Sequence, residues 1–356
     1  MSGDETECPR GASADRLRHR QAPKRELMTV NRRTTIVLVV ISVILVAVFG
    51  ITRWQRARAT QVLLDKLAGD DYGKVQDAMT QLRDRGAAIV PDLLEKLQSP
   101  EPAAKWRAAS LLGDVGGRRV WEPLMGALND ESTDVRAAAA VALGKLDAKD
   151  AVGPLASIVA DTEADVNLRI SAAEALALLA DEAAVASLAQ VLADHPPVLP
   201  PEPEVDPDEE AAEDAEPAEP PPPDTTELLR VRSARALGAI GTGECIAPLV
   251  QAAAETIEPS AEVRTAAAYA LGDVARRAPS GEHGTDLIRG LVGLQEDTVG
   301  DVRAAAIHSL GFATVTKEQE PVVTAAIKAG VADDFYWARE AARKSAKALN
   351  VVVVDA

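Results

Sequence analysis

The sequence predicts an all-α fold: an α-solenoid, or superhelix, of about seven stacked helix pairs that follows one transmembrane helix. Three observations predict it. A short phrase, an apolar residue with Arg followed by small residues and closed by Leu-Gly, recurs along the chain. Proline followed by apolar residues recurs between the copies, and an uncharged apolar run lies near the N-terminus.

The recurring phrase has the pattern of an amphipathic helix. Its copies close at positions 113, 144, 177, 238, 272 and 311, so most lie 31 to 39 residues apart. From Val135 to Leu146 the apolar residues fall at offsets 0, 3, 4, 7, 8 and 11, which form one stripe of an α-helix. Alanine fills most of this stripe, so a neighbouring helix can approach closely. The closing glycine suits the position just beyond a helix, where a positive φ is needed.

A second helix is predicted after each copy of the phrase. Apolar residues follow Pro91, Pro123, Pro154, Pro248 and Pro321. Proline is favoured at the start of a helix, where the N–H that it lacks would have no partner. Each unit is therefore a pair of helices, and because neither helix buries its stripe alone, the units must stack.

These repeats resemble the HEAT family, in the short, Ala-rich subtype named after phycobilisome lyases. The resemblance covers about residues 70–350, with a degenerate first repeat at 75–97 and a terminal one at 333–349. It implies a surface for protein–protein interaction, and a ladder between repeats formed by the Asp and Arg of the phrase. The matching residues are Asp134 with Arg136, Asp165 with Arg169, Glu262 with Arg264, Asp301 with Arg303, and Arg230.

One interval between copies, from 177 to 238, is nearly double the others. Residues 196–224 inside it hold eleven acidic residues, no Lys or Arg, and eleven of the chain's 22 prolines. Such a segment has little to bury, so we expect residues 196–225 to form a disordered, extended insert. Without residues 196–224 the interval of 61 becomes 32, an ordinary repeat. The insert therefore interrupts the array as a solvated loop, a polyproline-type docking site or an acidic self-masking segment.

The apolar run at residues 34–52 predicts a transmembrane signal anchor, behind a basic tail at 1–33 and ahead of a juxtamembrane helix at 53–69. Its nineteen residues span about 28 Å as a helix. Three Arg residues between the run and the nearest small-residue cleavage sequence disfavour the alternative, a cleaved signal peptide. The repeats then occupy 70–195 and 226–350, and a C-terminal tail occupies 351–356.

The distribution of Lys and Arg predicts the orientation. Residues 16–33 contribute seven and residues 53–66 contribute four, which favours a cytoplasmic N-terminus and extracytoplasmic, periplasmic repeats. If Met28 is the first residue, only Arg32, Arg33 and the α-amino group oppose those four, and the cytoplasmic face is the alternative. Abundant Ala and 27 Arg against 11 Lys are typical of a bacterial protein, so we expect a single-pass protein of the bacterial inner membrane.

Composition and motifs argue against catalysis and nucleic-acid binding. The net charge is −17, and the array has no basic stripe. The chain lacks the His-Glu dipeptides of the di-iron, deoxyhypusine-hydroxylase-like members of the family, and Cys8 and Cys245 lack metal-ligand spacing. We predict a membrane-anchored scaffold or adaptor with an unidentified protein partner and no catalytic residue, metal, cofactor or small-molecule substrate. The alternative is an enzyme or enzyme accessory of the phycobilin-lyase or deoxyhypusine-hydroxylase-like (oxidoreductase) branch.

Aromatic residues are the candidates for contact with a partner. Three of the chain's ten aromatic residues are consecutive: Phe335, Tyr336 and Trp337. This cluster suits either a cap on the last repeat or an exposed partner anchor. Tyr269 and His308 share offset 6 of the phrase, where the other copies differ widely, as is typical of an exposed face. We expect these two side chains to be stacked neighbours on that face.

Overall fold

The computed structural model describes residues 32–194, 226–277 and 284–353, which contain sixteen α-helices, seven short 3₁₀ segments and no strand. The predicted basic tail up to residue 31, the predicted insert at 196–225 and residues 354–356 lie outside the described ranges. The chain divides into two units, residues 1–58 and 59–356, each described by itself. The all-α class is confirmed for the described residues.

The first unit contains most of helix α1 (Arg32–Asp65), which continues into the second. From Ile36 to Ile51 its large apolar side chains are exposed. Its most apolar window has a mean hydropathy of 2.9, and among the described residues α1 is the one helix long and apolar enough to cross a membrane. By length and composition, α1 therefore matches the predicted membrane segment.

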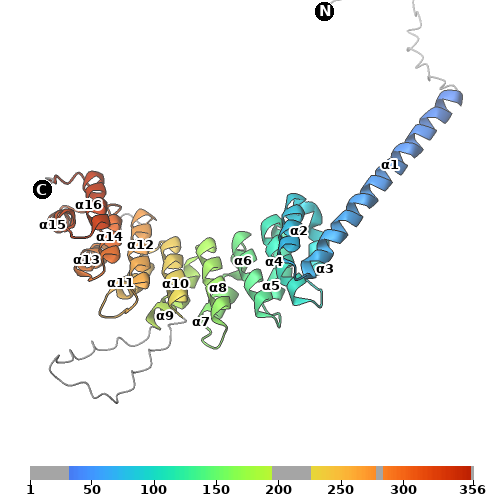
Figure 1. The fold of residues 1–356 in the computed structure, drawn as a ribbon. Coiled ribbons are helices and arrows are strands. Elements are labelled where there is room, and N and C mark those ends of the chain that lie inside the picture. The colour runs from blue at the N-terminus through green and yellow to red at the C-terminus, as the bar shows by residue number, and fades with distance from the viewer. Residues whose placement is uncertain (1–31, 195–225, 278–283, 354–356) are drawn as a thin grey trace, which may run out of the picture. The chain divides into compact units, whose positions relative to one another are not determined.

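The second unit is a row of helices in two layers (Figure 1). The even-numbered helices lie side by side in one layer, and from α3 onward each odd-numbered helix packs against the even-numbered helix that follows it. The even-numbered helices are α2 (Tyr72–Asp84), α4 (Pro102–Val115), α6 (Thr133–Lys145), α8 (Val166–Leu179), α10 (Glu227–Ile240), α12 (Ala261–Arg277), α14 (Gly300–Leu310) and α16 (Tyr336–Ala348). The odd-numbered helices are α3 (Val90–Lys96), α5 (Trp121–Ala127), α7 (Val152–Ala160), α9 (Val185–Ala193), α11 (Ile246–Ala253), α13 (Gly284–Gly293) and α15 (Glu320–Val331). The pairs from α3/α4 to α15/α16 number seven, so the predicted solenoid is confirmed.

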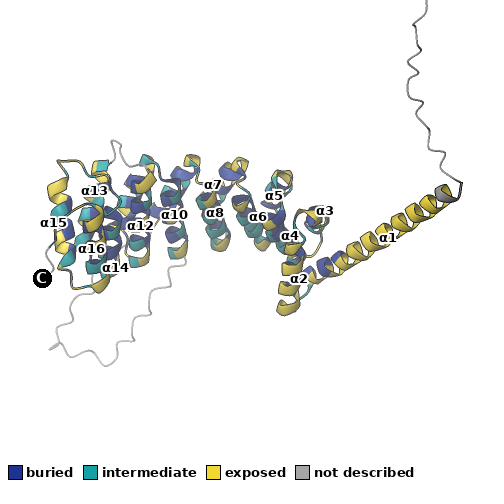
Figure 2. Cartoon of the chain, turned by 90° about the horizontal axis from the view of Figure 1, so that it is seen from above, coloured by how far each residue is buried: buried dark blue, intermediate teal, exposed yellow. Residues whose placement is uncertain are grey.

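The core of this unit lies where neighbouring helices face one another (Figure 2). The leucines that close each copy of the phrase, such as Leu143 and Leu237, have no exposed surface. Leu63 and Leu64 at the end of α1 belong to the same cluster, which extends to Ala346 in α16. One apolar core therefore runs along the whole row of repeats.

Five of the seven odd-numbered helices carry a predicted proline in their first three positions, though none carries it at the first position. Pro91 and Pro321 lie in the first two positions of α3 and α15. Pro154 and Pro248 lie one position further in, behind short 3₁₀ segments at Lys149–Ala151 and Gly243–Cys245. In the first turn a backbone N–H has no partner within the helix, so proline costs no hydrogen bond there.

The prediction that the closing glycine ends the first helix holds only at Gly311, just beyond α14, and the positive φ expected there is absent (−63°). Four of these glycines lie inside helices and none has a positive φ: Gly113, Gly144, Gly238 and Gly272. A Cβ on Gly144 would lie 2.7 Å from the Cα of Ala175 in α8, far closer than two carbon atoms can approach. A Cβ on Gly238 would likewise lie 2.9 Å from the Cα of Ala270 in α12. The glycine is needed because the backbones of successive even-numbered helices nearly touch there.

The positive φ that ends the helix comes three residues after the closing position. It is found at Asp147 (53°), Ala180 (48°) and Gly241 (72°), which follow positions 144, 177 and 238. Glycine is present at only one of these three places. The sequence phrase therefore marks the contact between helices, and the helix ends are set just beyond it.

Candidate functional site

Charged hydrogen bonds link the repeats at the N-terminal ends of the even-numbered helices. Arg264 on α12 donates from Nε and Nη2 to both carboxylate oxygens of Asp297, at 2.8 and 3.1 Å, in the loop that precedes α14. Its Nη1 donates to the backbone carbonyls of Glu258 and Pro259, in the loop that precedes α12. The two charged side chains are only 3% and 1% exposed. One guanidinium therefore ties together loops of successive repeats.

The same arrangement recurs along the array. The pairs are Arg230 with Glu258 (2.9 Å), Arg303 with Asp333 (2.8 Å) and Lys105 with Asp130 (2.7 Å). Each acid also accepts the backbone N–H two residues later, as Asp297 does from Val299 at 2.8 Å. Each acid therefore joins the Arg or Lys of one even-numbered helix to the backbone at the start of the next even-numbered helix.

Two of these ion pairs shift the pKa of a member. Hydrogen bonds from Arg303 hold the pKa of Asp333 below its ordinary value, and Asp333 raises the pKa of Arg303 in return. Burial raises the pKa of Asp130, but hydrogen bonds from Lys105 and from the backbone of Ser132 outweigh it, so this pKa is also lowered. The carboxyl groups of Asp333 and Asp130 are therefore held in their charged form.

The acids of the ladder are not those predicted. The predicted acids stand two to four residues before their Arg, whereas the acids that bind are in the loop after the next odd-numbered helix. Asp165 instead accepts the backbone N–H groups of Asn167 and Leu168 and caps α8. The sequence does contain a signal for the acids that bind. In the regular copies of the phrase it is an acidic residue six positions before the Arg, as Asp297 is before Arg303. Those acids bind the Arg of the preceding repeat.

Two of the predicted Arg residues contact neutral groups. Nη2 of Arg136 donates to the Thr133 hydroxyl at 3.1 Å, and Nε of Arg169 donates to the Val159 carbonyl at 3.0 Å. The ladder of ion pairs is thus most regular in the C-terminal repeats, from α10 to α16.

The remaining predicted acids line grooves on the exposed side of the even-numbered helices. We call this surface the even-helix face; it is formed by residues at offsets −1, 2, 6 and 10 from the apolar residue that opens each phrase. Two grooves of about 410 Å³ each lie on it. We name them the Tyr269 groove and the Val141 groove, after their offset-6 residues. Grooves also open beside the odd-numbered helices, including one of about 670 Å³ between α11 and α13.

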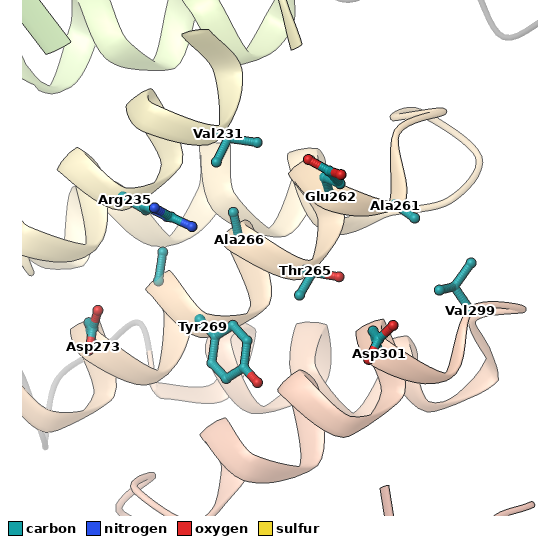
Figure 3. A pocket seen from close by; sticks show the side chains of 11 residues that line it. Val231, Arg235, Ala261, Glu262, Thr265, Ala266, Tyr269, Asp273, Val299 and Asp301 are labelled. Carbon is teal, nitrogen blue, oxygen red and sulfur yellow. The ribbon is translucent and has the colours of Figure 1, made fainter. Parts of the chain in front are cut away.

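The Tyr269 groove crosses α10, α12 and α14 (Figure 3). It is lined by Val231, Arg235, Ala261, Glu262, Thr265, Ala266, Tyr269, Ala270, Asp273, Val299 and Asp301. In the view of Figure 3, Glu262 and Asp301 lie on one side of the Tyr269 ring, and Arg235 and Asp273 lie on the other. Three carboxylates against one guanidinium give the lining a formal charge of −2.

The Val141 groove lies on α4, α6 and α8. It is lined by Trp106, Ser110, Asp134, Ala137, Ala138, Val141, Ala142, Lys145 and Ser171. Asp134 and Lys145 give it a formal charge of zero. On the central helix the two grooves share six lining offsets, and the Tyr269 groove adds Ala261. The two grooves are therefore equivalent parts of the repeat with different chemistry.

Tyr269 and His308 are brought together as expected. Their ring centroids are 5.9 Å apart in an edge-to-face arrangement, and His308 stands 5.0 Å from Phe312 in the same way. The guanidinium of Arg276 lies over the Phe312 ring at 4.3 Å. Burial, followed by the charges of Arg276 and Lys344, lowers the pKa of His308, which favours the neutral imidazole.

Of the three aromatic residues at 335–337, the first packs inward, as expected of a cap, and the other two are exposed, as expected of a partner anchor. Phe335 packs against the last small apolar cluster, beside Gly300, whose missing side chain leaves room for the ring. Tyr336 and Trp337 are 54% and 61% exposed, with their rings 5.0 Å apart. Trp337 stands at offset −1, in line with Glu262 and Asp301.

Within the described ranges, no three side chains of His, Cys, Asp or Glu gather closely enough to hold a metal ion. Cys245 is buried, and its sulfur lies 3.5 Å from the Thr242 hydroxyl. Both observations concern described residues only; His19, His195, His283 and Cys8 lie outside them.

The sequence profile of HEAT repeats matches residues 90–167 and 223–311. These two stretches of the chain match HEAT repeats. The two matched stretches lie on either side of the predicted insert and include the central helices of both grooves, α6 and α12. A comparison with curated protein sequences finds no significant match.

The chain is similar to several solved structures. One is a chain of the CpcE–CpcF complex of phycocyanin lyase from Nostoc sp. PCC7120, with 22% identity over 73% of this chain and 94% of that one and a TM-score of 0.41. An engineered protein matches with 17% identity over 83% and 79% of the two chains, and a TM-score of 0.46. A chain from the complex of Kap95p with RanGDP has 13% identity over 81% of this chain and 39% of that one, with a TM-score of 0.51. At such identities the likeness concerns the fold alone.

Proposed function

We propose that this chain is a membrane-anchored HEAT-repeat scaffold that binds a protein partner along its even-helix face. The observation that carries the proposal is the recurrence of one groove at the same helical offsets, with different side chains in different repeats. Stacked repeats create extended surfaces of this kind, and varied residues on a constant backbone supply specificity. HEAT-repeat proteins that resemble the chain are found in complexes with other proteins, which supports a protein as the partner.

The anchor in this proposal is α1. Its exposed apolar side chains would face water without a lipid or protein covering, at a large cost in free energy. Trp54 and Arg53 follow the apolar run, and such residues suit the boundary between hydrocarbon and water. The anchor holds the repeats at the extracytoplasmic surface of the inner membrane of a bacterial cell, with the cytoplasmic surface as the alternative.

Photocrosslinking in intact membranes tests the binding surface. We would place p-benzoylphenylalanine at position 269 on the even-helix face, and at position 157 as the matched control. Ser157 is exposed on α7, in the other layer. The proposal predicts a discrete crosslinked protein from position 269 and none from position 157. Equal crosslinking from both positions would contradict it.

The enzyme alternative makes a different prediction. A di-iron enzyme of the deoxyhypusine-hydroxylase-like branch should retain iron in the purified full chain, close to two atoms per molecule. A scaffold should contain iron only in trace amounts. Elemental analysis after purification without chelators distinguishes them, and stoichiometric iron would replace the scaffold proposal.

A further inference from the structure

We infer that the Tyr269 groove binds a lysine or arginine side chain of the protein partner, with the cation held between Glu262 and Asp301 and against the Tyr269 ring. The inference rests on the proposed function, because it assumes that the even-helix face is the binding surface. It goes beyond that function by assigning a charge and a residue class to the partner segment.

The first argument is that the two acids are not used within the described part of the chain. Both are exposed, and within the described residues neither side chain makes a hydrogen bond or ion pair. The neighbouring acids Glu258 and Asp297 are buried and fully engaged by Arg230 and Arg264. The repeat thus has two kinds of acid: one holds the repeats together, and the other faces solvent in the groove.

The second argument is the shape and chemistry of the groove between these acids. Val231, Ala266 and Val299 provide apolar surface on which the methylene groups of a Lys or Arg side chain can pack. The Tyr269 ring is 48% exposed beside this surface, and its face attracts a cation. Asp273 is paired with Arg276, so the acids available to a partner are Glu262 and Asp301. These two acids make the lining complementary to a basic side chain and unfavourable to an acidic one.

An acid in the first turn of a helix also has a purely structural use, since it stabilises the positive end of the helix dipole. Glu262 and Asp301 occupy such positions, and so does Asp134 in α6. The Val141 groove therefore supplies the control for this role. There the next helix has Asn167 at offset −1, and offset 6 is Val141, so the second acid and the aromatic ring of the central helix are both missing. The aromatic residue of that groove, Trp106, lies on α4 instead. A dipole effect should be common to the two grooves, whereas cation binding should belong to the Tyr269 groove.

The test uses purified full-length protein in detergent and an array of dodecapeptides in which each position is varied among Lys, Glu, Leu and Ser. For the wild type, the bound peptides should be enriched in Lys at one fixed position. The affinity of the best peptide, measured by fluorescence anisotropy, should fall at least ten-fold in the double variant Glu262→Gln with Asp301→Asn. It should fall several-fold in Tyr269→Leu, and change less than two-fold in Asp134→Asn. Thermal unfolding followed by circular dichroism checks that all variants are folded.

Three outcomes would overturn the inference: enrichment of Glu or Leu in place of Lys, selection for Lys that persists in the double variant, or no binding by any peptide. None of them decides the proposed function, because crosslinking from position 269 in membranes is measured independently. Conversely, crosslinking confined to the other layer would end the proposed function whatever peptides the groove selects.

Discussion

Buried ion pairs in the HEAT repeats are held by more than mutual attraction. Removing two charges from water costs several kcal/mol for each ion, and the interior repays it only where the remaining hydrogen-bonding groups are also satisfied. Arg264 meets this condition, because all three nitrogens of its guanidinium group donate: Nε and Nη2 to Asp297, and Nη1 to backbone carbonyls. The pair therefore fixes the register between two repeats as well as contributing to stability.

Replacing Arg264 with Met should leave the Asp297 carboxylate buried without its partner. We expect a loss of about 3 to 5 kcal/mol in the free energy of unfolding, the range for breaking a buried pair on one side. Urea unfolding of the full chain, followed by circular dichroism, measures it. The control is Arg289→Met, which removes an exposed pair with Asp286 and should change little. Equal effects of the two substitutions would show that burial does not govern the ladder.

The lowered pKa of Asp333 predicts how stability depends on pH. A carboxyl whose pKa is lower in the folded state than its ordinary value of 3.8 stabilises the fold fully above that value. This contribution is lost as the pH falls from 3.8 through the folded-state pKa. The difference in thermal midpoint between the wild type and Asp333→Asn should therefore be largest near neutral pH and shrink below pH 3.8. A constant difference across this range would contradict the assignment.

At the scale of the helices, the sequence correctly predicted both helices of each repeat but not the role of the closing glycine. The apolar stripe and the prolines predicted both helices of each repeat, because periodicity and first-turn preferences are local properties. The closing glycine has two possible uses, a helix end or a close contact, and only the neighbouring helix decides between them. The ladder acids were missed for the same reason, since each binds an Arg about 30 residues earlier in the chain.

The last two contacts between even-numbered helices differ from the others. There the residue that faces the glycine is Ser309 or Ser345, and each hydroxyl donates to a backbone carbonyl of the preceding even-numbered helix at 2.8 Å. At the earlier contacts, alanine faces the glycine at Gly113, Gly144 and Gly238. The close approach therefore remains constant, while the polar bond between helices is present only near the C-terminal end.

Substituting Gly144 with Ala tests the close approach of helices directly. Its new Cβ would overlap the backbone of Ala175, so α6 and α8 must move apart, at a cost of about 1 to 3 kcal/mol. Gly153→Ala is the matched control, because nothing lies within 4 Å of a Cβ at that position. Denaturation by urea should show a clear loss for the first variant and little change or a small gain for the second. If Gly144→Ala is as stable as the wild type, the proposed reason for the glycine is wrong.

At the scale of the whole chain, the number of repeats was predictable but the partner was not. The helix pairs share one packing pattern, so the phrase that encodes it recurs along the sequence, in six copies. The grooves arise where side chains of three successive helices meet, and their chemistry depends on residues that vary between repeats. The disordered insert at 196–225 remains a prediction from composition.

The orientation of the anchored chain can be measured with a reporter that is active on one side of the membrane. Alkaline phosphatase fused after residue 356 should be active, because the greater number of Lys and Arg residues before the apolar run favours retention of the N-terminus in the cytoplasm. A fusion of the same enzyme before residue 1 is the control and should be inactive. Activity of the N-terminal fusion alone would place the repeats in the cytoplasm.

The central claim is that the even-helix face binds the partner across several repeats. A crosslinking scan tests it most directly, with p-benzoylphenylalanine placed in turn at offset 6 of successive even-numbered helices. The positions are 110, 141, 174, 235, 269 and 308, and exposed residues of the other layer at 157, 251 and 322 are the controls. The account predicts that one and the same protein is crosslinked from several consecutive positions of the even-helix face and from none of the controls. Crosslinks from the control positions alone, or from both layers equally, would contradict it.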